Sequence, residues 1–223
     1  GKHPQALAVA VDRIGFGDSD ELTGPISIEQ SAAATLEALD ALGIDRFDVV
    51  GIHTGSSEAI ELAAAQPHRV RRVGVVGITA FTDEERAAFS REAPPPLRAD
   101  GSHLLDTWNL VQRPDLQPPV DGVRWTIADV NRQAVLSLRA GVAKWWLHNA
   151  VRQHRTAERM REVRQPFLVL APHDDVWAET QRALPELPRH AQVVELPHMA
   201  YEVFTLDAEE LAARIRSFLD VLA

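Results

Sequence analysis

The chain has 223 residues, of which 45% are hydrophobic and 25% charged, a composition typical of one water-soluble domain of enzyme size. A net charge of −9 argues against nucleic acid or an anionic membrane as a partner, because Lys and Arg are outnumbered and are not clustered. The absence of cysteine excludes disulfides and thiolate metal sites and suits a reducing cytoplasm. No run has transmembrane length and the first residues form no signal-peptide core. We therefore expect a cytoplasmic protein that acts on a small molecule, while its oligomeric state stays open.

The first third of the chain alternates between strand and helix patterns. We predict a first strand over Ala6 to Asp12, followed by a glycine-containing turn over residues 13–20. Ser27-x-x-Gln30 is a capping box for a helix that ends at Gly43. Apolar runs at residues 47–52 and 71–77 predict two strands, and the valine-rich second run indicates a strand that is buried on both faces. This order indicates a parallel, doubly wound sheet.

The most informative motif lies between a predicted strand and a predicted helix. Gly51-Ile52-His53-Thr54-Gly55 has the frame Gly-x-Ser-x-Gly of a nucleophile elbow, with histidine in place of serine. Such a turn holds one side chain in a strained conformation at the top of the sheet, and small neighbours let strand and helix approach closely. A second frame, residues 55–59, would place a serine at Ser57, about one turn inside the helix. The sequence is compatible with either His53 or Ser57 at the turn.

The alternation stops between Ala80 and Arg164. A helix is predicted to begin at Thr82-Asp83-Glu84-Glu85. A second helical segment is predicted over residues 127–161, with an interruption near Gly141. Four tryptophans fall in this region: Trp108, Trp125, Trp145 and Trp146. The strand and helix pattern then resumes and ends in an amphipathic helix over residues 206–222.

These motifs, in this order, closely resemble the α/β-hydrolase superfamily over about two-thirds of the chain. Pro166 to Asp175 looks like the family's strand and acid-bearing turn, and Val193 to Met199 looks like the segment that carries the catalytic histidine. The resemblance implies a mostly parallel α/β-hydrolase core over residues 1–80 and 165–223, with a helical lid over residues 81–164. It also implies Asp175 as the acid, His198 as the base and the backbone N–H of Thr54 as an oxyanion donor. Three departures are His53 for serine, Ser56 for a second glycine, and Pro172 for the turn glycine.

The resemblance also raises a question about the N-terminal strands. Ala6 to Asp12 corresponds to the family's fourth strand, so strands one to three appear absent from the chain. A missing central strand would leave buried backbone groups unpaired, at about 1–3 kcal/mol each. We therefore expect either a fragment, an omission from the sequence, or a partner segment that fills the gap.

Two catalytic routes are open for His53. In one, the imidazole is a covalent nucleophile and forms a labile acyl-imidazole. In the other, which we favour, Asp175 orients His198 as a general base while His53 donates a hydrogen bond to the oxyanion. Neither route needs a cofactor. A metal site built from His53, His198 and Asp175 is a weaker alternative, because Asp175 should lie behind His198.

The leading functional expectation is a hydrolase of an ester, lactone or related carbonyl compound. A cofactor-free lyase or C–C bond-cleaving enzyme is the second hypothesis, and a non-catalytic binding protein of the same fold is the third. The lid residues that could line a substrate pocket are His103, Trp108, Trp145 and Trp146. As alternatives, His103 could be a surface residue and the tryptophans lid core.

Overall fold

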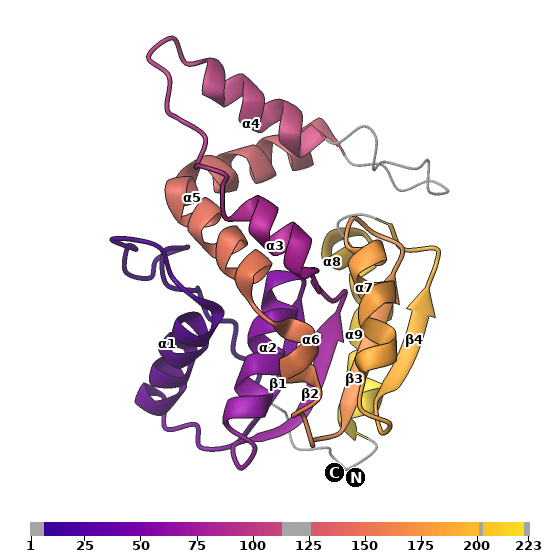
Figure 1. Ribbon diagram of the computed structural model, residues 1–223. Coiled ribbons are helices and arrows are strands. Elements are labelled where there is room, and N and C mark those ends of the chain that lie inside the picture. The colour runs from indigo at the N-terminus through magenta and orange to yellow at the C-terminus, as the bar shows by residue number, and fades with distance from the viewer. Residues whose placement is uncertain (1–6, 113–125, 201–202, 221–223) are drawn as a thin grey trace.

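A four-stranded parallel sheet forms the centre of the molecule. The computed structural model describes residues 7–112, 126–200 and 203–220 (Figure 1). The strand order is β1-β2-β3-β4, and every neighbouring pair is parallel. The strands are β1 (Phe47–Ile52), β2 (Val70–Val76), β3 (Phe167–Pro172) and β4 (Gln192–Leu196). The predicted α/β class and parallel sheet are confirmed.

Strand β3 shows why these strands read as continuous apolar runs. Phe167, Val169 and Ala171 belong to the core cluster on one face of the sheet. Leu168 and Leu170 alternate with them and belong to the cluster on the opposite face. Side chains of a strand point alternately to its two faces, so a strand covered on both sides is apolar at every position.

Helices cover both faces of the sheet and extend beyond the carboxyl ends of its strands (Figure 1). Side chains of α2, α6 and α7 pack in the first cluster, and those of α8 and α9 pack in the second. The helical layer α3–α5 lies beyond the strand ends (Figure 1). The helices are α1 (Ile28–Ala41), α2 (Thr54–Ala65), α3 (Asp83–Phe89), α4 (Ser102–Gln112), α5 (Ile127–Gln153), α6 (Thr156–Met160), α7 (Trp177–Ala183), the 3-10 turn η1 (Leu184–Glu186), α8 (Val203–Leu206) and α9 (Ala208–Asp220).

Local sequence signals account for several helix boundaries. The side chain of Ser27 accepts a hydrogen bond from the N–H of Gln30 at 3.2 Å, and the Gln30 side chain accepts one from the N–H of Ser27 at 2.8 Å. Thr82 forms the same reciprocal cap at the start of α3. The long helix α5 is interrupted at Gly141, which has a φ of 53°. These predicted features are confirmed.

The predicted first strand is wrong for the residues that the structure describes. Residues 7–12 form no strand, and Ala6 lies outside the described part of the chain. The alternating apolar side chains Leu7, Val9 and Val11 are exposed, at 81%, 42% and 37%. Within the described residues β1 pairs only with β2, so no adjacent backbone holds this segment in the sheet.

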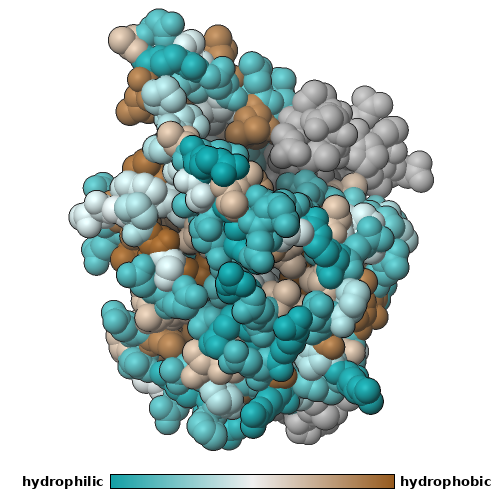
Figure 2. All heavy atoms as spheres, viewed as in Figure 1, coloured by the Kyte–Doolittle hydropathy of each residue, from teal (hydrophilic) through white to brown (hydrophobic). Residues whose placement is uncertain are grey.

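The helical layer carries many of the exposed apolar side chains. Figure 2 shows hydrophilic residues over most of the visible face, with hydrophobic patches around α4 and α5. Exposed members include Leu105 on α4 and Leu136 on α5. No helix in the described ranges is both long and apolar enough to cross a bilayer.

Candidate active site

His53 occupies a strained turn between β1 and α2. Its φ of 45° makes it the one non-glycine residue with positive φ among those described. Such backbone strain costs about 1–3 kcal/mol and persists where the surroundings enforce it. A Cβ atom at Gly51 would lie only 1.9 Å from the carbonyl oxygen of Gly55, so the turn requires glycine there. The predicted elbow geometry at His53 is therefore confirmed.

Hydrogen bonds to the end of β2 hold this turn. The N–H of His53 donates to the carbonyl oxygen of Val76 at 3.1 Å. The hydroxyl of Ser56 lies 3.1 Å from the carbonyl oxygen of Gly51 and 3.2 Å from that of Val76. Serine at position 56, where the family often has glycine, thus ties the helix start to both strands.

The alternative frame at Ser57 is excluded by burial. Ser57 lies inside α2 with 0% exposure. Its hydroxyl is hydrogen-bonded to those of Thr79 at 2.8 Å and Thr156 at 3.0 Å. A substrate cannot reach this oxygen in the observed packing.

A buried carboxylate fixes the orientation of the His53 ring. Nε2 of His53 lies 2.8 Å from Oδ2 of Asp174, whose side chain is 2% exposed. The other oxygen of Asp174 accepts the N–H of Val176 at 3.1 Å. An ionised carboxylate only accepts hydrogen bonds, so Nε2 of a neutral His53 carries the proton and Nδ1 the lone pair. Gly77 makes room for the ring, since a Cβ there would lie 2.9 Å from Cδ2 of His53.

The structure corrects the predicted pairing of Asp175 with His198. Oδ1 of Asp175 lies 3.9 Å from Nδ1 of His53, whereas Nε2 of His198 lies 2.9 Å from Oε2 of Glu210 on α9. The His198 side chain is 53% exposed. The reason is the next residue: Met199 is fully buried in the core cluster of the second sheet face, so its neighbour His198 points outward. The catalytic role of His198 stays a prediction.

The start of α2 provides positive potential next to His53. Thr54 is the first residue of the helix, where backbone N–H groups have no partner within the helix. The guanidinium of Arg13 lies close by, because a Cβ at Gly55 would be 2.7 Å from its Nη2. Arg13 is held there by Glu58, with Nε 2.6 Å from Oε2. The helix dipole and this cation both favour an anion near the elbow.

His148 on α5 interacts electrostatically with His53 and was not predicted from the sequence. Protein surrounds its ring although water reaches it, and this desolvation lowers its pKa to about 4. The positive charges of Lys144 and Arg152, and that of His53 when its imidazole is protonated, lower the pKa of His148 further. His148 is therefore neutral near pH 7. Its spacing of four residues from Lys144 places both on one helix face, a signal that the sequence contained.

The predicted pocket residues have varied surroundings. Nδ1 of His103 accepts the backbone N–H of Arg98 at 3.1 Å. Trp108 packs against the apolar cluster between α4 and α5. The guanidinium of Arg152 lies 5.6 Å from the Trp145 ring, and Trp146 is half-buried. Trp125 lies outside the described residues. Substrate contacts by these side chains stay predictions.

Two groups of described residues could hold a metal ion. His53, Asp174 and Asp175 have ligand atoms within 4.8 Å of one another, as do Glu29, Glu61 and His154. The first group replaces the predicted set with His198, because His198 faces Glu210.

Comparisons with known proteins agree with this architecture. No family model matches the sequence. A pyrrolizixenacetamide deacetylase of Xenorhabdus hominickii is 27% identical over 95% of this chain and 79% of its own length. A 2-hydroxy-6-oxo-2,4-heptadienoate hydrolase of Pseudomonas putida is 36% identical over 40% of this chain and 34% of its own length.

Solved structures show the same fold. A hydrolase from Pseudomonas aeruginosa has a TM-score of 0.70 at 22% identity, with 93% of this chain and 77% of that chain covered. An enol-lactonase from Burkholderia xenovorans has a TM-score of 0.64 at 19% identity, with 93% and 78% covered. The elbow, the parallel sheet and these neighbours agree: the chain has the α/β-hydrolase fold, and its relatives are hydrolases of the α/β-hydrolase superfamily.

Proposed function

We propose that the chain is a hydrolase of an ester, lactone or related carbonyl compound, with His53 as its general base and Asp174 as the carboxylate that orients it. The observation that carries this proposal is the imidazole at the strained elbow, 2.8 Å from a carboxylate that is 2% exposed. A serine nucleophile is absent from this position, so the imidazole itself is the reactive group. The hydrolytic relatives support the reaction class.

In the proposed reaction, Nδ1 of His53 takes a proton from water. The resulting hydroxide attacks the substrate carbonyl carbon, and the carbonyl electrons move to oxygen. The oxyanion lies at the α2 N-terminus, where the N–H of Thr54 donates a hydrogen bond. Collapse of the intermediate expels the leaving group, which receives the proton from Nδ1. Asp174 and the nearby Asp175 stabilise the transient imidazolium.

His53 acts as a base in this scheme rather than as the oxyanion donor that the sequence favoured. Its Nε2–H is directed to Asp174, so the neutral ring has no second N–H to offer an oxyanion. The covalent route through an acyl-imidazole uses the same Nδ1 and stays open. It predicts an added acyl mass on quenched enzyme, which the general-base route does not.

We propose that residues 81–164 form the lid, and residues 1–80 and 165–223 the catalytic core. Helices α3–α5 lie beyond the carboxyl ends of the strands, on the side of the elbow (Figure 1). His148 on α5 interacts electrostatically with His53, which supports a lid that borders the site. The end of the segment also belongs to the core, since Met160 packs in the cluster of the first sheet face.

The second candidate is proton-transfer chemistry on a carbon acid, by a cofactor-free lyase or C–C bond-cleaving enzyme. The observation that favours it is again a base, rather than a serine, at the elbow. Such an enzyme would abstract a proton from the substrate instead of water. A non-catalytic protein of this fold would bind without turnover.

Hydrolysis of a panel of p-nitrophenyl and aliphatic esters and lactones tests the proposal. We expect turnover by the native chain and a loss of about 10²–10⁴ in rate for His53→Ala. His53→Gln, of similar volume, separates the loss of the base from the loss of packing. Full activity in both variants would exclude His53 as the base.

A further inference from the structure

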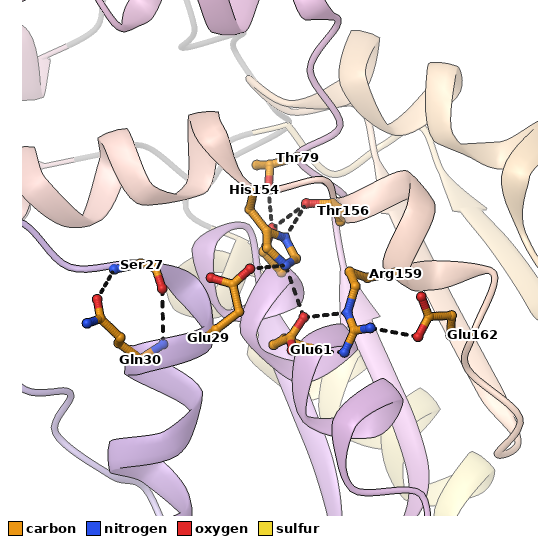
Figure 3. A network of polar contacts seen from close by, with 10 residues as sticks. Ser27, Glu29, Gln30, Glu61, Thr79, His154, Thr156, Arg159 and Glu162 are labelled. Atoms are coloured by element: carbon orange, nitrogen blue, oxygen red, sulfur yellow. Dashed lines mark hydrogen bonds and ion pairs between the residues drawn. The ribbon is translucent and has the colours of Figure 1, made fainter.

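A second polar cluster lies away from the elbow, where α1, α2 and the end of α5 meet (Figure 3). Glu29 comes from α1, Glu61 from α2, and His154 directly follows α5. Nε2 of His154 lies 3.2 Å from Oε2 of Glu61 and 4.0 Å from Oε1 of Glu29. Glu61 follows His53 by eight residues, which places it about 12 Å farther along the helix at 1.5 Å per residue. The cluster is therefore separate from the proposed catalytic site.

From this arrangement we propose that Glu29, Glu61 and His154 bind a divalent transition-metal ion of the Zn²⁺ type. A buried imidazole nitrogen and two carboxylates are a donor set that suits such an ion. The His154 side chain is 1% exposed and that of Glu61 is 6% exposed, while the Glu29 side chain is 58% exposed. Two ligands are thus held by the fold, and the third can move to close the site.

The orientation of His154 supports the proposal. Nδ1 of His154 lies 3.0 Å from the hydroxyl of Thr156, which lies 3.0 Å from that of Ser57. An ionised carboxylate only accepts hydrogen bonds, so without an ion the Nε2–H of His154 donates to Oε2 of Glu61 and Nδ1 accepts from the Thr156 hydroxyl. Nε2 faces the carboxylates of Glu61 and Glu29 (Figure 3). A divalent ion at this position would take the place of the Nε2 proton, and an Nδ1–H would then donate to the Thr156 hydroxyl, as metal-bound imidazoles commonly do.

The ligand distances are close to those that a metal ion imposes. Ligands at 2.0–2.2 Å from a tetrahedral centre lie about 3.3–3.6 Å apart. The contact of 3.2 Å between His154 and Glu61 is near this value, and the 4.0 Å contact with Glu29 is slightly longer. A small rotation of the exposed Glu29 side chain closes the difference.

Glu61 can keep its salt bridge with Arg159 while it binds an ion. Arg159 binds both carboxylate oxygens, with Nε 2.7 Å from Oε2 and Nη2 2.9 Å from Oε1. Each oxygen has two lone pairs, so Oε2 can accept Arg159 and coordinate an ion together.

The cluster is open to solvent through a groove of about 400 Å³ that Glu29 and His154 line. Glu158 and Glu162 add two carboxylates to this groove, and Arg155 and Arg159 add two guanidinium groups. Together with Glu29 and Glu61 this makes four carboxylates and two guanidinium groups around the cluster. Their net charge is −2, without any charge on His154. A divalent ion neutralises this excess. Asn149 also lines the groove, and its buried Oδ1 has no hydrogen-bond partner among the described residues.

The experiment is a Zn²⁺ titration of the chelator-treated, desalted protein by calorimetry, with thermal unfolding in parallel. We expect binding and a rise in Tm that depends on the Zn²⁺ concentration, because an ion that binds only the folded chain stabilises it. Glu29→Gln removes one exposed ligand and should weaken Zn²⁺ binding by about tenfold or more. Glu158→Gln is the matched control, since Glu158 lines the same groove but pairs with Arg155 at 2.6 Å. This control should keep the native affinity.

Two outcomes would overturn the proposal. One is equal Zn²⁺ affinity in the native chain and the Glu29→Gln variant, or no binding in either. The other is binding that is lost in Asp175→Asn and kept in Glu29→Gln, which would place the ion at the elbow cluster. Co²⁺ absorbance of the native chain and both Glu variants provides a second readout. All these measurements are independent of turnover, so they stand or fall separately from the proposed hydrolase activity.

Discussion

Asp174→Asn should impair catalysis far more than Asp175→Asn, although the sequence favoured Asp175 as the acid. Oδ2 of Asp174 lies 2.8 Å from Nε2 of His53 in a pocket that leaves its side chain 2% exposed. The asparagine oxygen keeps the N–H of Val176, so its NH₂ faces Nε2 of His53, the ring proton must move to Nδ1, and the proposed basic nitrogen is lost. A positioned general base contributes about 10²–10⁴ in rate, so we expect a loss of this size.

Asp175 offers a weaker interaction with the same ring. Its Oδ1 lies 3.9 Å from Nδ1 of His53, beyond hydrogen-bond distance, and its side chain is 28% exposed. Solvent-screened ion pairs contribute about 0–1 kcal/mol. Because about 1.4 kcal/mol corresponds to a tenfold change in rate, Asp175→Asn should lower the rate by less than about tenfold.

The assay is kcat/KM on the ester that the native enzyme turns over best, with circular dichroism and Tm as controls for folding. The two variants differ by one position and each replaces a carboxylate by its amide, so each is the matched control of the other. Losses of similar size in both, or a larger loss in Asp175→Asn with both proteins folded, would refute the assignment of Asp174.

Most of the core fold could be predicted because its signals are local. The strand at residues 47–52 has the observed bounds of β1, since an apolar run lies between turn residues. The caps at Ser27 and Thr82 depend on contacts within four residues. The segment 7–12 failed because alternation of apolar residues only indicates a strand, and no neighbouring strand is present for it in the described residues. Strand formation depends on such distant partners.

The sequence predicts the elbow of the site, but it does not predict which side chains contact the elbow residue. His53 is fixed by Gly51, Gly55 and the adjoining strand, which all lie close in sequence. Which of two adjacent aspartates faces His53 depends on how the turn after β3 lies against the elbow. The direction of His198 likewise depends on the burial of Met199 in a core built from distant elements. Sequence periodicity does not resolve either choice.

Further variants test the remaining parts of the site. His198→Ala should keep at least about a tenth of the native rate, since the ring faces Glu210 and lies outside the proposed scheme; a loss of 10²-fold or more would restore it as the base. Gly77→Ala should cost up to about 10²-fold in kcat, because a Cβ there would displace the His53 ring that it approaches at 2.9 Å. The pKa of His148 is about 4 in the folded chain and 6.5 in its ordinary state. Between pH 6.5 and 4 the unfolded chain therefore binds a proton that the folded chain does not, and the stability of the folded chain falls as the pH falls. His148→Gln should make that decline in Tm shallower, and an unchanged profile would contradict the pKa. Finally, His53→Gly should be more stable than His53→Ala when both are made in an Asp174→Asn background, where no buried carboxylate loses its partner. Relief of the strain at a φ of 45° is worth about 1–3 kcal/mol, and the greater freedom of unfolded glycine offsets about 0.5–1 kcal/mol. The difference of these two ranges is about 0–2.5 kcal/mol, so urea unfolding should favour glycine by about 1 kcal/mol, the reverse of the usual order. An alanine variant more stable than the glycine variant by the full offset of about 0.5–1 kcal/mol would show that the elbow stores no strain.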